Sequence, residues 1–379
     1  MTFDSIYSEI RPYRDHEFRD VMDRMLNSPM AELLISTVFP DIPVRSIKNL
    51  LKEINTINEF QEKVIYKALL GLLSKTSSGL SHSGTENINS GSTYLFISNH
   101  RDIILDPSLL NTVIFEKGFE TAEVAIGDNL LETAWVKDLA RLNKSFIVKR
   151  NLSVRELVIS SKLLSNYISE TILQRNHSVW IAQREGRAKD GNDKTQPGLL
   201  NMIGMSAPGS LKDHFMKMNI VPVSISYEHD PCDVDKLRSL YAKKFFGGYT
   251  KEKNEDNLAM RKGILGYKGK IHFHFGKPIG NEISSLPDSL HKSELIQQVG
   301  GFLDRQIIGN YKTQKSNFIA YDILHDKIEE GINYSKMDIE EFNDDMNQKI
   351  ATMAGEKEEL KSMFLEMYAR PYQNKLDLF

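Results

Sequence analysis

The sequence is poor in cysteine, since Cys232 is the only one among 379 residues. A lone cysteine excludes an internal disulfide framework, and it excludes a zinc or iron–sulfur site built from several cysteines. The chain therefore fits a reducing compartment, and chemistry that depends on thiolate-bound metal is not expected.

Long apolar runs are also missing. A membrane-spanning helix needs roughly 20 mostly apolar residues, whereas the best candidate, residues 64–73, is about half that length and includes Lys67. The first 18 residues carry charges throughout and have no apolar core, so they do not resemble a secretory signal. With 40% hydrophobic and 26% charged residues, the composition predicts a folded soluble protein, which we expect to be cytoplasmic.

Charge is unevenly distributed along the chain. The net charge is −3, but residues 321–379 contain 14 acidic and 7 basic side chains, a net of −7, which leaves +4 on residues 1–320. This mildly basic body lacks the dense basic face that non-specific nucleic-acid binding requires, so no nucleic-acid partner is expected. It suits anionic small substrates or an anionic membrane surface.

The spacing of apolar residues divides the chain into three parts. Residues 1–76 show helical spacing without strand-like alternation, and the Ser-, Gly- and Asn-rich residues 77–92 predict a flexible connector. We therefore expect an N-terminal helical domain with its linker over 1–92, an α/β domain over 93–320 and an acidic helical tail over 321–379, with tail helices at 323–332 and 337–365.

Short apolar runs alternate with longer helical patterns in the central part. Strands are expected at 93–98, 123–126, 145–149, 178–182, 220–226 and 270–275, and helices at 107–115, 131–142 and 153–173. Alternation of this kind is typical of an α/β fold. We therefore expect a mixed sheet flanked by helices.

The segment Ser98–Pro107 (SNHRDIILDP) follows a predicted strand, where α/β folds place ligand-binding groups. His100 at this strand end suits a general base, and a carboxylate about one turn away would bind its other ring nitrogen and favour the imidazolium. Asp102 and Asp106 are both candidates for that carboxylate. Asp106 also has a structural explanation, because Asp before Pro107 is a typical N-cap of a helix.

Several other functions are excluded. His100–Asp102 spells the start of a kinase catalytic loop, but the Asn expected five residues after the Asp is Pro107, and no Gly-rich phosphate loop is present. The sequence also lacks a Gly-x-Ser-x-Gly elbow, a P-loop and a dinucleotide fingerprint. His272 and His274 share one strand face without an evident third ligand, so no metal site is expected.

Basic residues gather at the ends of two predicted strands. Lys149 and Arg150 end one strand, while Arg184, Arg187 and Lys189 follow the next. Both groups are expected to converge on the sheet edge that carries His100, where they would bind a phosphate, with bidentate contacts from Arg. Each of them taken alone is explained as well or better by solvated surface charge.

Four segments resemble, in order, the four sequence blocks of the glycerolipid acyltransferases: Ser98–His100 with Asp106–Pro107, Phe146–Arg150, Glu185–Arg187 and Val221–His229. The likeness is strongest to the glycerol-3-phosphate acyltransferase branch, whose fourth block runs into a similar Tyr-Glu-His. It covers about residues 93–280, and it includes further matches at 195–198, 251–253 and 275–279. Four blocks in the family's order are far more specific than any one of them.

Two features depart from the family's pattern. The family separates its catalytic His and Asp by four residues, whereas His100 and Asp106 are separated by five. The resemblance favours Asp106, and Asp102 remains the alternative. The third block normally reads Glu-Gly-x-Arg, whereas Arg187 follows Gly186 directly, so we expect Arg187 to share its role with Lys189. The implied substrate-binding set is Arg101, Lys149, Arg150, Glu185, Gly186, Arg187 and Lys189.

The resemblance implies an O-acyltransferase of membrane lipid synthesis. It would move a fatty acyl chain from acyl carrier protein or coenzyme A to a hydroxyl of glycerol-3-phosphate or a lysophospholipid, without a cofactor or a metal. Membrane contact would be peripheral, at the inner face of the cell membrane, through amphipathic stretches such as 30–39 or 64–73. Packing within the helical domain explains these stretches equally.

Two alternatives remain open. One is an O-acyltransferase for a lyso-lipid with an amino-acid head group. The other is a catalytically inactive protein that binds lipid or an acyl carrier, and His100 with a nearby acid argues against it. Consumption of a thioester with release of free thiol distinguishes an enzyme from a binding protein.

Overall fold

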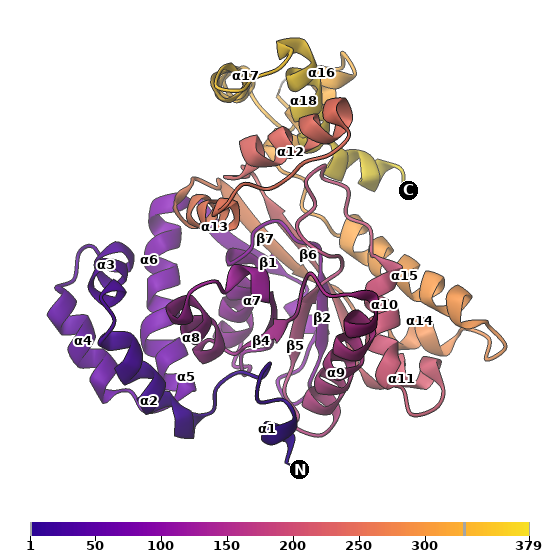
Figure 1. Ribbon diagram of the computed structural model, residues 1–379. Coiled ribbons are helices and arrows are strands. Elements are labelled where there is room, and N and C mark those ends of the chain that lie inside the picture. Colours follow the sequence, from indigo (N-terminus) through magenta and orange to yellow (C-terminus); the bar gives the residue numbers. More distant parts are fainter. Residues whose placement is uncertain (1, 329–330, 379) are drawn as a thin grey trace.

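A seven-stranded sheet forms the centre of the computed structural model, which describes residues 2–328 and 331–378 (Figure 1). The strand order is β1-β7-β6-β2-β5-β3-β4. Neighbouring strands run parallel except β6 and β7, which are antiparallel. The expected mixed sheet is confirmed, and its strands are β1 (Gly79–Ser83), β2 (Leu95–Ser98), β3 (Glu123–Gly127), β4 (Ser145–Val148), β5 (Val179–Ala182), β6 (Ile220–Tyr227) and β7 (Lys270–Phe275).

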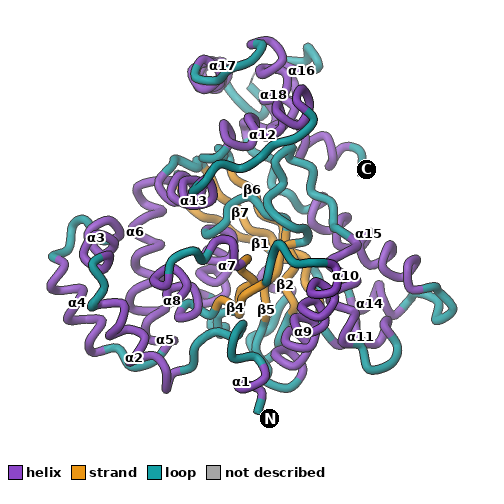
Figure 2. Tube along the Cα trace, viewed as in Figure 1, coloured by secondary structure: helices purple, strands orange, loops and turns teal. Residues whose placement is uncertain are grey.

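Helices cover both faces of this sheet (Figure 2). On one face Leu95 and Ile97 of β2 belong to a core completed by α9 (Val154–Leu173), α10 (Pro197–Ile203), α11 (Leu211–Lys217) and α15 (Lys292–Gly309). On the other face Phe96 packs with α7 (Leu105–Glu116) and α6 (Lys67–Thr76). Burial on both faces explains why the central strands are continuous apolar runs in the sequence.

Six strands lie where the sequence predicts them, and the seventh corrects the expected flexible connector over residues 77–92. Gly79–Ser83 form β1, the parallel edge partner of β7. The hydroxyl of Ser83 lies 2.9 Å from Nε2 of His272 and 2.8 Å from Nδ1 of His274. The polar side chains of this segment therefore find partners on a strand far away in the sequence, which composition does not reveal.

The N-terminal residues fold into short helices, as their apolar spacing predicts. They are α1 (Phe3–Ile6), α2 (Asp15–Leu26), α3 (Met30–Val38), α4 (Val44–Glu53), α5 (Ile57–Phe60) and a π-helical stretch, Gln61–Tyr66, that leads into α6. Phe18, Leu51 and Phe60 are buried together with Leu142 of α8 (Ala134–Leu142). The helical region is thus joined to the α/β body through α8.

The C-terminal helices are α16 (Lys315–Leu324), α17 (Lys336–Ala351) and α18 (Lys357–Leu376), and they gather with α12 (Asp233–Phe246) at the top of Figure 1. The helix expected at 323–332 is wrong, because α16 ends at Leu324 and residues 325–328 leave the helix; residues 329–330 lie outside the described part.

The helix expected at 337–365 is interrupted between α17 and α18. Gly355 in this gap has φ +135°, and an added Cβ there would lie 2.8 Å from the ring of Tyr241. The sharp turn therefore requires glycine. Residues of α12 and α16 share a buried core with α17 and α18. The helices of the acidic C-terminal part therefore pack against α12.

The helices expected at 107–115, 131–142 and 153–173 are confirmed as α7, α8 and α9. Two further α-helices, α13 (Glu255–Leu265) and α14 (Gly280–Ser284), and three short 3-10 helices complete the described fold. The 3-10 helices are Thr85–Asn87, Asp128–Leu130 and Gly204–Ser206. Within residues 2–328 and 331–378, no helix combines the length and the apolar content that crossing a bilayer takes.

Candidate active site

His100 stands at the carboxyl end of β2 and is paired with Asp106 in the first turn of α7. Nδ1 of His100 lies 2.8 Å from Oδ2 of Asp106, with 13% of the histidine side chain exposed and none of the aspartate. The ring of Trp180 from β5 meets the imidazole edge-on at 5.7 Å between centroids. With Nδ1 engaged by the carboxylate, Nε2 is the nitrogen left to accept a proton.

The carboxylate of Asp106 is fixed by three further donors. Its Oδ2 accepts the backbone N–H groups of Arg101 at 2.6 Å and of Asp102 at 3.0 Å, and its Oδ1 accepts the hydroxyl of Tyr227 at 2.9 Å. Burial and the nearby charge of Asp106 raise the pKa of the Tyr227 hydroxyl, so it stays a donor. The pair is therefore preorganised before any substrate binds.

Asp102 closes the turn that leads into α7, whose N-cap residue is Ile104. Helix α7 begins at Leu105, and Oδ1 of Asp102 accepts the N–H groups of Ile104 at 2.9 Å and of Leu105 at 2.7 Å. The N-cap expected at Asp106 is wrong, because its side chain turns back to His100. The extra residue between His100 and Asp106 is thus absorbed by a turn that the Asp102 carboxylate closes.

Helix α13 lies directly against this turn. A Cβ added to Gly263 would stand 2.0 Å from Oδ2 of Asp102, so only glycine lets the helix approach so closely. Asp102 is buried by this contact, and burial together with the charge of Asp106 raises the pKa of its carboxyl. The neighbouring α13 residues Asp256 and Ala259 line the cavity described next.

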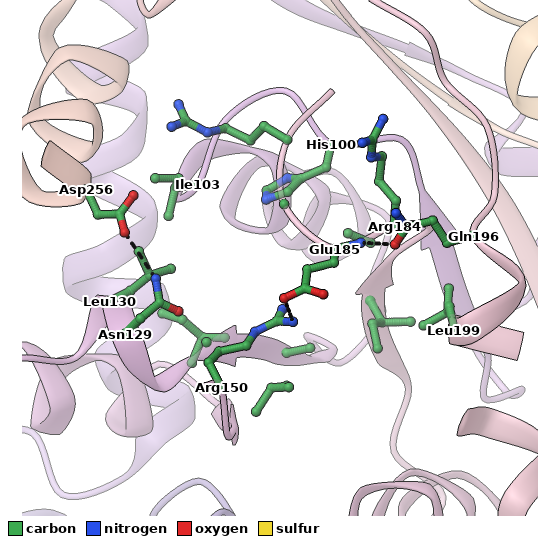
Figure 3. Close-up of a pocket in the computed structure, with 18 of the residues that line it drawn as sticks. His100, Ile103, Asn129, Leu130, Arg150, Arg184, Glu185, Gln196, Leu199 and Asp256 are labelled. Carbon is green, nitrogen blue, oxygen red and sulfur yellow. Dashed lines mark hydrogen bonds and ion pairs between the residues drawn. The ribbon is translucent and has the colours of Figure 1, made fainter. Parts of the chain in front are cut away.

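His100 lines a cavity of about 880 Å³ formed by the ends of β3, β4 and β5 and by α9, α10, α12 and α13. In Figure 3, Arg184 lies on the same side of the cavity as His100, while Arg150 and Glu185 meet across from them. Another part of the lining is apolar and combines residues of several elements: Ala125, Ile126, Leu130, Val148, Leu164, Trp180, Leu199 and Met202. A single space thus joins a proposed base, cations and an apolar wall.

The structure brings most of the expected substrate-binding residues to this cavity. Lys149, Arg150, Glu185, Gly186, Arg187 and Lys189 line it together with His100. Arg101 does not, because its guanidinium pairs with Asp193 and lies 5.6 Å from the ring centre of Tyr311. Its side chain lines a second, smaller pocket together with Tyr311 instead.

The cations of the cavity differ in how they are neutralised. Lys149 pairs with Glu9 at 2.8 Å, and Arg150 pairs with Glu185 at 2.6 Å. By contrast, Nη1 of Arg187 and Nε of Arg184 are buried without a hydrogen-bond partner in the described residues. Buried unpaired donors of this kind are costly unless an acceptor completes them.

Lys189 stands in a group of like charges. Its Nζ donates to the hydroxyl of Ser239 at 2.6 Å. Burial, together with the positive charges of Lys243 and Lys251, lowers the pKa of Lys189 to about 8. Lys243 and Lys251 come from α12 and the segment after it, and both line the cavity.

Sequence reasoning assigned no role to Tyr227, Lys243 or Gly263. Tyr227 stands in the fourth block, which marked it, but the other two carried no local signal. No group of three His, Cys, Asp or Glu side chains is placed to hold a metal ion in the part of the chain that the structure describes.

Comparison with known proteins gives an independent result. Residues 79–226 match the family model described as Acyltransferase. The chain is 26% identical over 242 residues to a glycerol-3-phosphate acyltransferase of Pseudoalteromonas translucida (strain TAC 125), which covers 61% of this chain and 28% of that protein. It is 28% identical over 202 residues to the protein of the same name from Pseudoalteromonas atlantica (strain T6c / ATCC BAA-1087). That alignment covers 52% of this chain and 23% of the relative.

The aligned region therefore spans only about a quarter of each of these relatives. Among solved structures, the chain is similar to the 1-acyl-sn-glycerophosphate (LPA) acyltransferase PlsC from Thermotoga maritima, with a TM-score of 0.36 and 12% identity. This match covers 76% of the present chain and 92% of the other.

Proposed function

We propose that this chain, whose residues 79–226 match the family model described as Acyltransferase, is a glycerolipid acyltransferase that transfers a fatty acyl group from a thioester to a hydroxyl of a glycerol-phosphate-type acceptor. The donor is acyl carrier protein or coenzyme A, and the acceptor is glycerol-3-phosphate or a lysophospholipid. The observation that carries the proposal is the His100–Asp106 pair, held at 2.8 Å on the wall of a cavity with both cationic and apolar surfaces.

The proposed reaction follows from this geometry. Nε2 of His100 removes the acceptor's hydroxyl proton while the hydroxyl oxygen attacks the thioester carbonyl. Collapse of the tetrahedral intermediate forms the ester and breaks the carbon–sulfur bond. The imidazolium then returns the proton to the departing thiolate. The buried charge of Asp106 favours the imidazolium throughout, and no covalent enzyme intermediate is needed.

Arg187 and Arg184 are proposed to hold the acceptor's phosphate. Each has a buried nitrogen without a partner, and guanidinium groups bind phosphate oxygens in a bidentate manner. Lys189 adds a further cation beside them, which agrees with the shared role expected from the shortened third block. Arg150 is held by Glu185, so we propose that this ion pair orders the site rather than carrying the phosphate alone.

The apolar part of the cavity is proposed to take the acyl chain. Leu130, Leu164 and Met202 line it from three different elements, and transfer of an alkyl chain from water to such an apolar wall is favoured by the hydrophobic effect. The acyl product belongs in a bilayer, so we also propose peripheral membrane contact. Of the two stretches considered above, 64–73 has Val64 and Leu73 buried, whereas α3 exposes Met30 and Leu33. The vesicle experiment described below therefore compares α3 with a second exposed apolar surface.

A direct assay tests the proposed function. The purified chain is given acyl carrier protein or coenzyme A thioesters together with glycerol-3-phosphate, lysophosphatidic acid or an amino-acid lyso-lipid. Free thiol is measured, and the product is identified by mass spectrometry. We expect ester formation with a phosphate-bearing acceptor and its loss in His100→Ala, by about 10²- to 10⁴-fold. Thiol release that persists in a folded His100→Ala protein contradicts the mechanism, and no turnover with any pair favours a binding protein.

A further inference from the structure

The first two turns of α9 expose a patch of large aliphatic side chains. Val154 is 83% exposed, Leu157 53%, Val158 55% and Ile159 62%. Single exposed apolar residues are ordinary, but four large ones within the first two turns of one helix indicate an interaction surface. We call these four residues the α9 patch.

Val154 and Val158 of the α9 patch continue the face that packs α9 into the core. Positions 154, 158, 161, 165 and 168 share one side of the helix, because they recur at intervals of three and four. Further along this side Ser165 and Ile168 are buried, and the hydroxyl of Ser165 donates to the carbonyl of Ile203 at 2.8 Å. Val154 and Val158 extend beyond this cover into solvent.

The α9 patch also adjoins the cavity. Leu157 belongs to both, since it is half exposed and lines the cavity, and Ser161 and Leu164 continue the lining along the same helix. Figure 1 shows α9 at the front of the molecule, at one side of the sheet. The exposed surface and the apolar wall are therefore parts of one helix.

Basic residues surround the α9 patch. Residues 149–162 contain four basic side chains and one acid, Glu156. Lys149 and Arg150 are paired with Glu9 and Glu185, so Arg155 and Lys162 are the cations of the helix itself that border the α9 patch. Glu156 is engaged at the helix start, where its carboxylate accepts the N–H of Ser153 at 3.0 Å and its hydroxyl at 2.6 Å. An apolar helix face bordered by Lys and Arg is the composition that binds an anionic lipid surface.

We propose that the amino-terminal end of α9 docks this protein on an anionic bilayer. Val154, Val158 and Ile159 enter the boundary between head groups and acyl chains, while Arg155 and Lys162 contact lipid phosphates. Docking places Leu157, and with it the cavity, at the bilayer surface. The proposal rests on the proposed function, which gives the bilayer as the place of the product.

The test replaces Val154, Val158 and Ile159 together by Gln. Gln favours a helix at least as well as Val or Ile, so α9 is retained, and none of the three residues lines the cavity. The matched control replaces Met30, Leu33 and Val38 of α3 by Gln, which are 47%, 59% and 49% exposed. Binding is measured by flotation with vesicles of phosphatidylglycerol and phosphatidylcholine, and turnover is measured with a water-soluble short-chain thioester and glycerol-3-phosphate.

We expect the α9 variant to bind these vesicles at least about tenfold more weakly than the wild type, which corresponds to about 1.4 kcal/mol. The α3 control should bind as the wild type does, and vesicles of phosphatidylcholine alone should bind the wild type less. Soluble turnover should be equal in all three proteins. Unchanged vesicle binding by the α9 variant, or a loss confined to the α3 control, overturns the proposal.

Two other outcomes separate the proposals from each other. If the α9 variant keeps its vesicle binding but shows a raised KM for acyl carrier protein without vesicles, the α9 patch binds the carrier protein and the docking proposal is wrong. If none of the proteins turns over any thioester while vesicle binding changes as expected, the docking proposal stands and the proposed function fails.

Discussion

The charge of Asp106 and its hydrogen bonds have different consequences for His100. Four donors surround the carboxylate, counting Nδ1 of His100, so its position is fixed by the loop and by Tyr227. An amide of the same shape keeps one oxygen for the three donors on Oδ2, and its NH2 group can donate to the hydroxyl of Tyr227. It loses the charge that favours the imidazolium. Substituting one group for the other therefore tests the electrostatic part separately.

Asp106→Asn should lower kcat by at least about 10²-fold at nearly unchanged thermal stability, because general-base catalysis of this kind is worth about 10² to 10⁴. Asp102→Asn should be milder, since an amide oxygen can still accept the N–H groups of Ile104 and Leu105. Steady-state kinetics and thermal melts of both variants check the ranking. The reverse ranking would mean that Asp102, and not Asp106, supports the base.

Arg187→Lys should raise KM for a phosphate-bearing acceptor more than KM for the thioester donor. The substitution keeps the charge but loses the bidentate geometry, and in this chain one Arg187 nitrogen is buried without a partner. Arg150→Lys is the control, because Arg150 already pairs with Glu185 and should affect the acceptor KM less. Equal effects on both substrates would remove Arg187 from the phosphate site.

Contacts between elements decide how the catalytic loop is held. Helix α13 follows β6 and α12 in the chain, yet it lies against the turn after β2 through the contact between Gly263 and Asp102. Lys268 strengthens this arrangement, because its buried Nζ donates to the carbonyl of Ile264 at 2.8 Å at the carboxyl end of α13. One helix thus supports the loop and forms part of the cavity wall.

Gly263→Ala should destabilise the fold by about 1 to 3 kcal/mol, the usual cost of overpacking, and lower kcat more than it changes KM. The new Cβ would have to displace Asp102, which closes the turn beside His100. Gly301→Ala in α15 is the matched control, since no atom lies within 4 Å of its added Cβ. That variant should gain up to about 1 kcal/mol, because Ala is the better helix former. Chemical denaturation and kinetics check both, and wild-type kcat in Gly263→Ala would show that the contact does not position the loop.

Strands with apolar runs were predictable from the sequence, whereas strand β1 was not. The buried strands β2 and β6 carry their signal in their own residues, because both faces meet apolar helices. Strand β1, Gly-Leu-Ser-His-Ser, is only partly buried. It depends on β7 for its backbone pairing and for the histidines that bind the hydroxyl of Ser83. Its partner lies too far along the chain for a local pattern to show it.

The candidate site likewise contains residues that the sequence could predict and residues that it could not. His100, Asp106, Arg187 and Lys189 follow strands or stand in family blocks, so they could be named from the sequence. The choice between Asp102 and Asp106 needed coordinates, because both lie within a turn of His100 and only the backbone decides which side chain turns back. Gly263 could not be found, since its role is the absence of a side chain at a contact between distant segments.

Helices α16, α17 and α18, which we call the C-terminal bundle, are connected to the α/β body through buried polar contacts. The N–H of Asp230, just after β6, donates to the hydroxyl of Tyr368 at 3.1 Å, and that hydroxyl donates to Asp233 at 2.9 Å. The hydroxyl of Ser316 donates to the carbonyl of Glu228. The bundle therefore holds the segment that follows Tyr227, which itself binds Asp106.

Lys349 of α17 completes this connection, because its Nζ lies 2.8 Å from Oδ2 of Asp233, which is 2% exposed. Lys349→Met should destabilise the protein by about 2 to 3 kcal/mol near neutral pH, since it leaves a buried carboxylate without its cation. Asp345→Asn is the control. It removes a partner of the same lysine at 2.6 Å, but Asp345 is 42% exposed, so the loss should stay below about 1 kcal/mol.

The pH dependence of the Lys349→Met variant gives a sharper test. Burial already raises the pKa of Asp233, and loss of the cation should raise it further. The Asp233 carboxyl of the folded variant therefore keeps its proton up to a higher pH than the same carboxyl in the unfolded chain. A group with a raised folded pKa supports stability below its unfolded pKa and loses that support as pH rises through the folded value. The difference in the free energy of unfolding between wild type and Lys349→Met should therefore be smallest near pH 4 and grow toward neutral pH. Urea denaturation across this range measures it, and a difference independent of pH would mean that the lost stability comes from packing of the lysine stem and not from its charge.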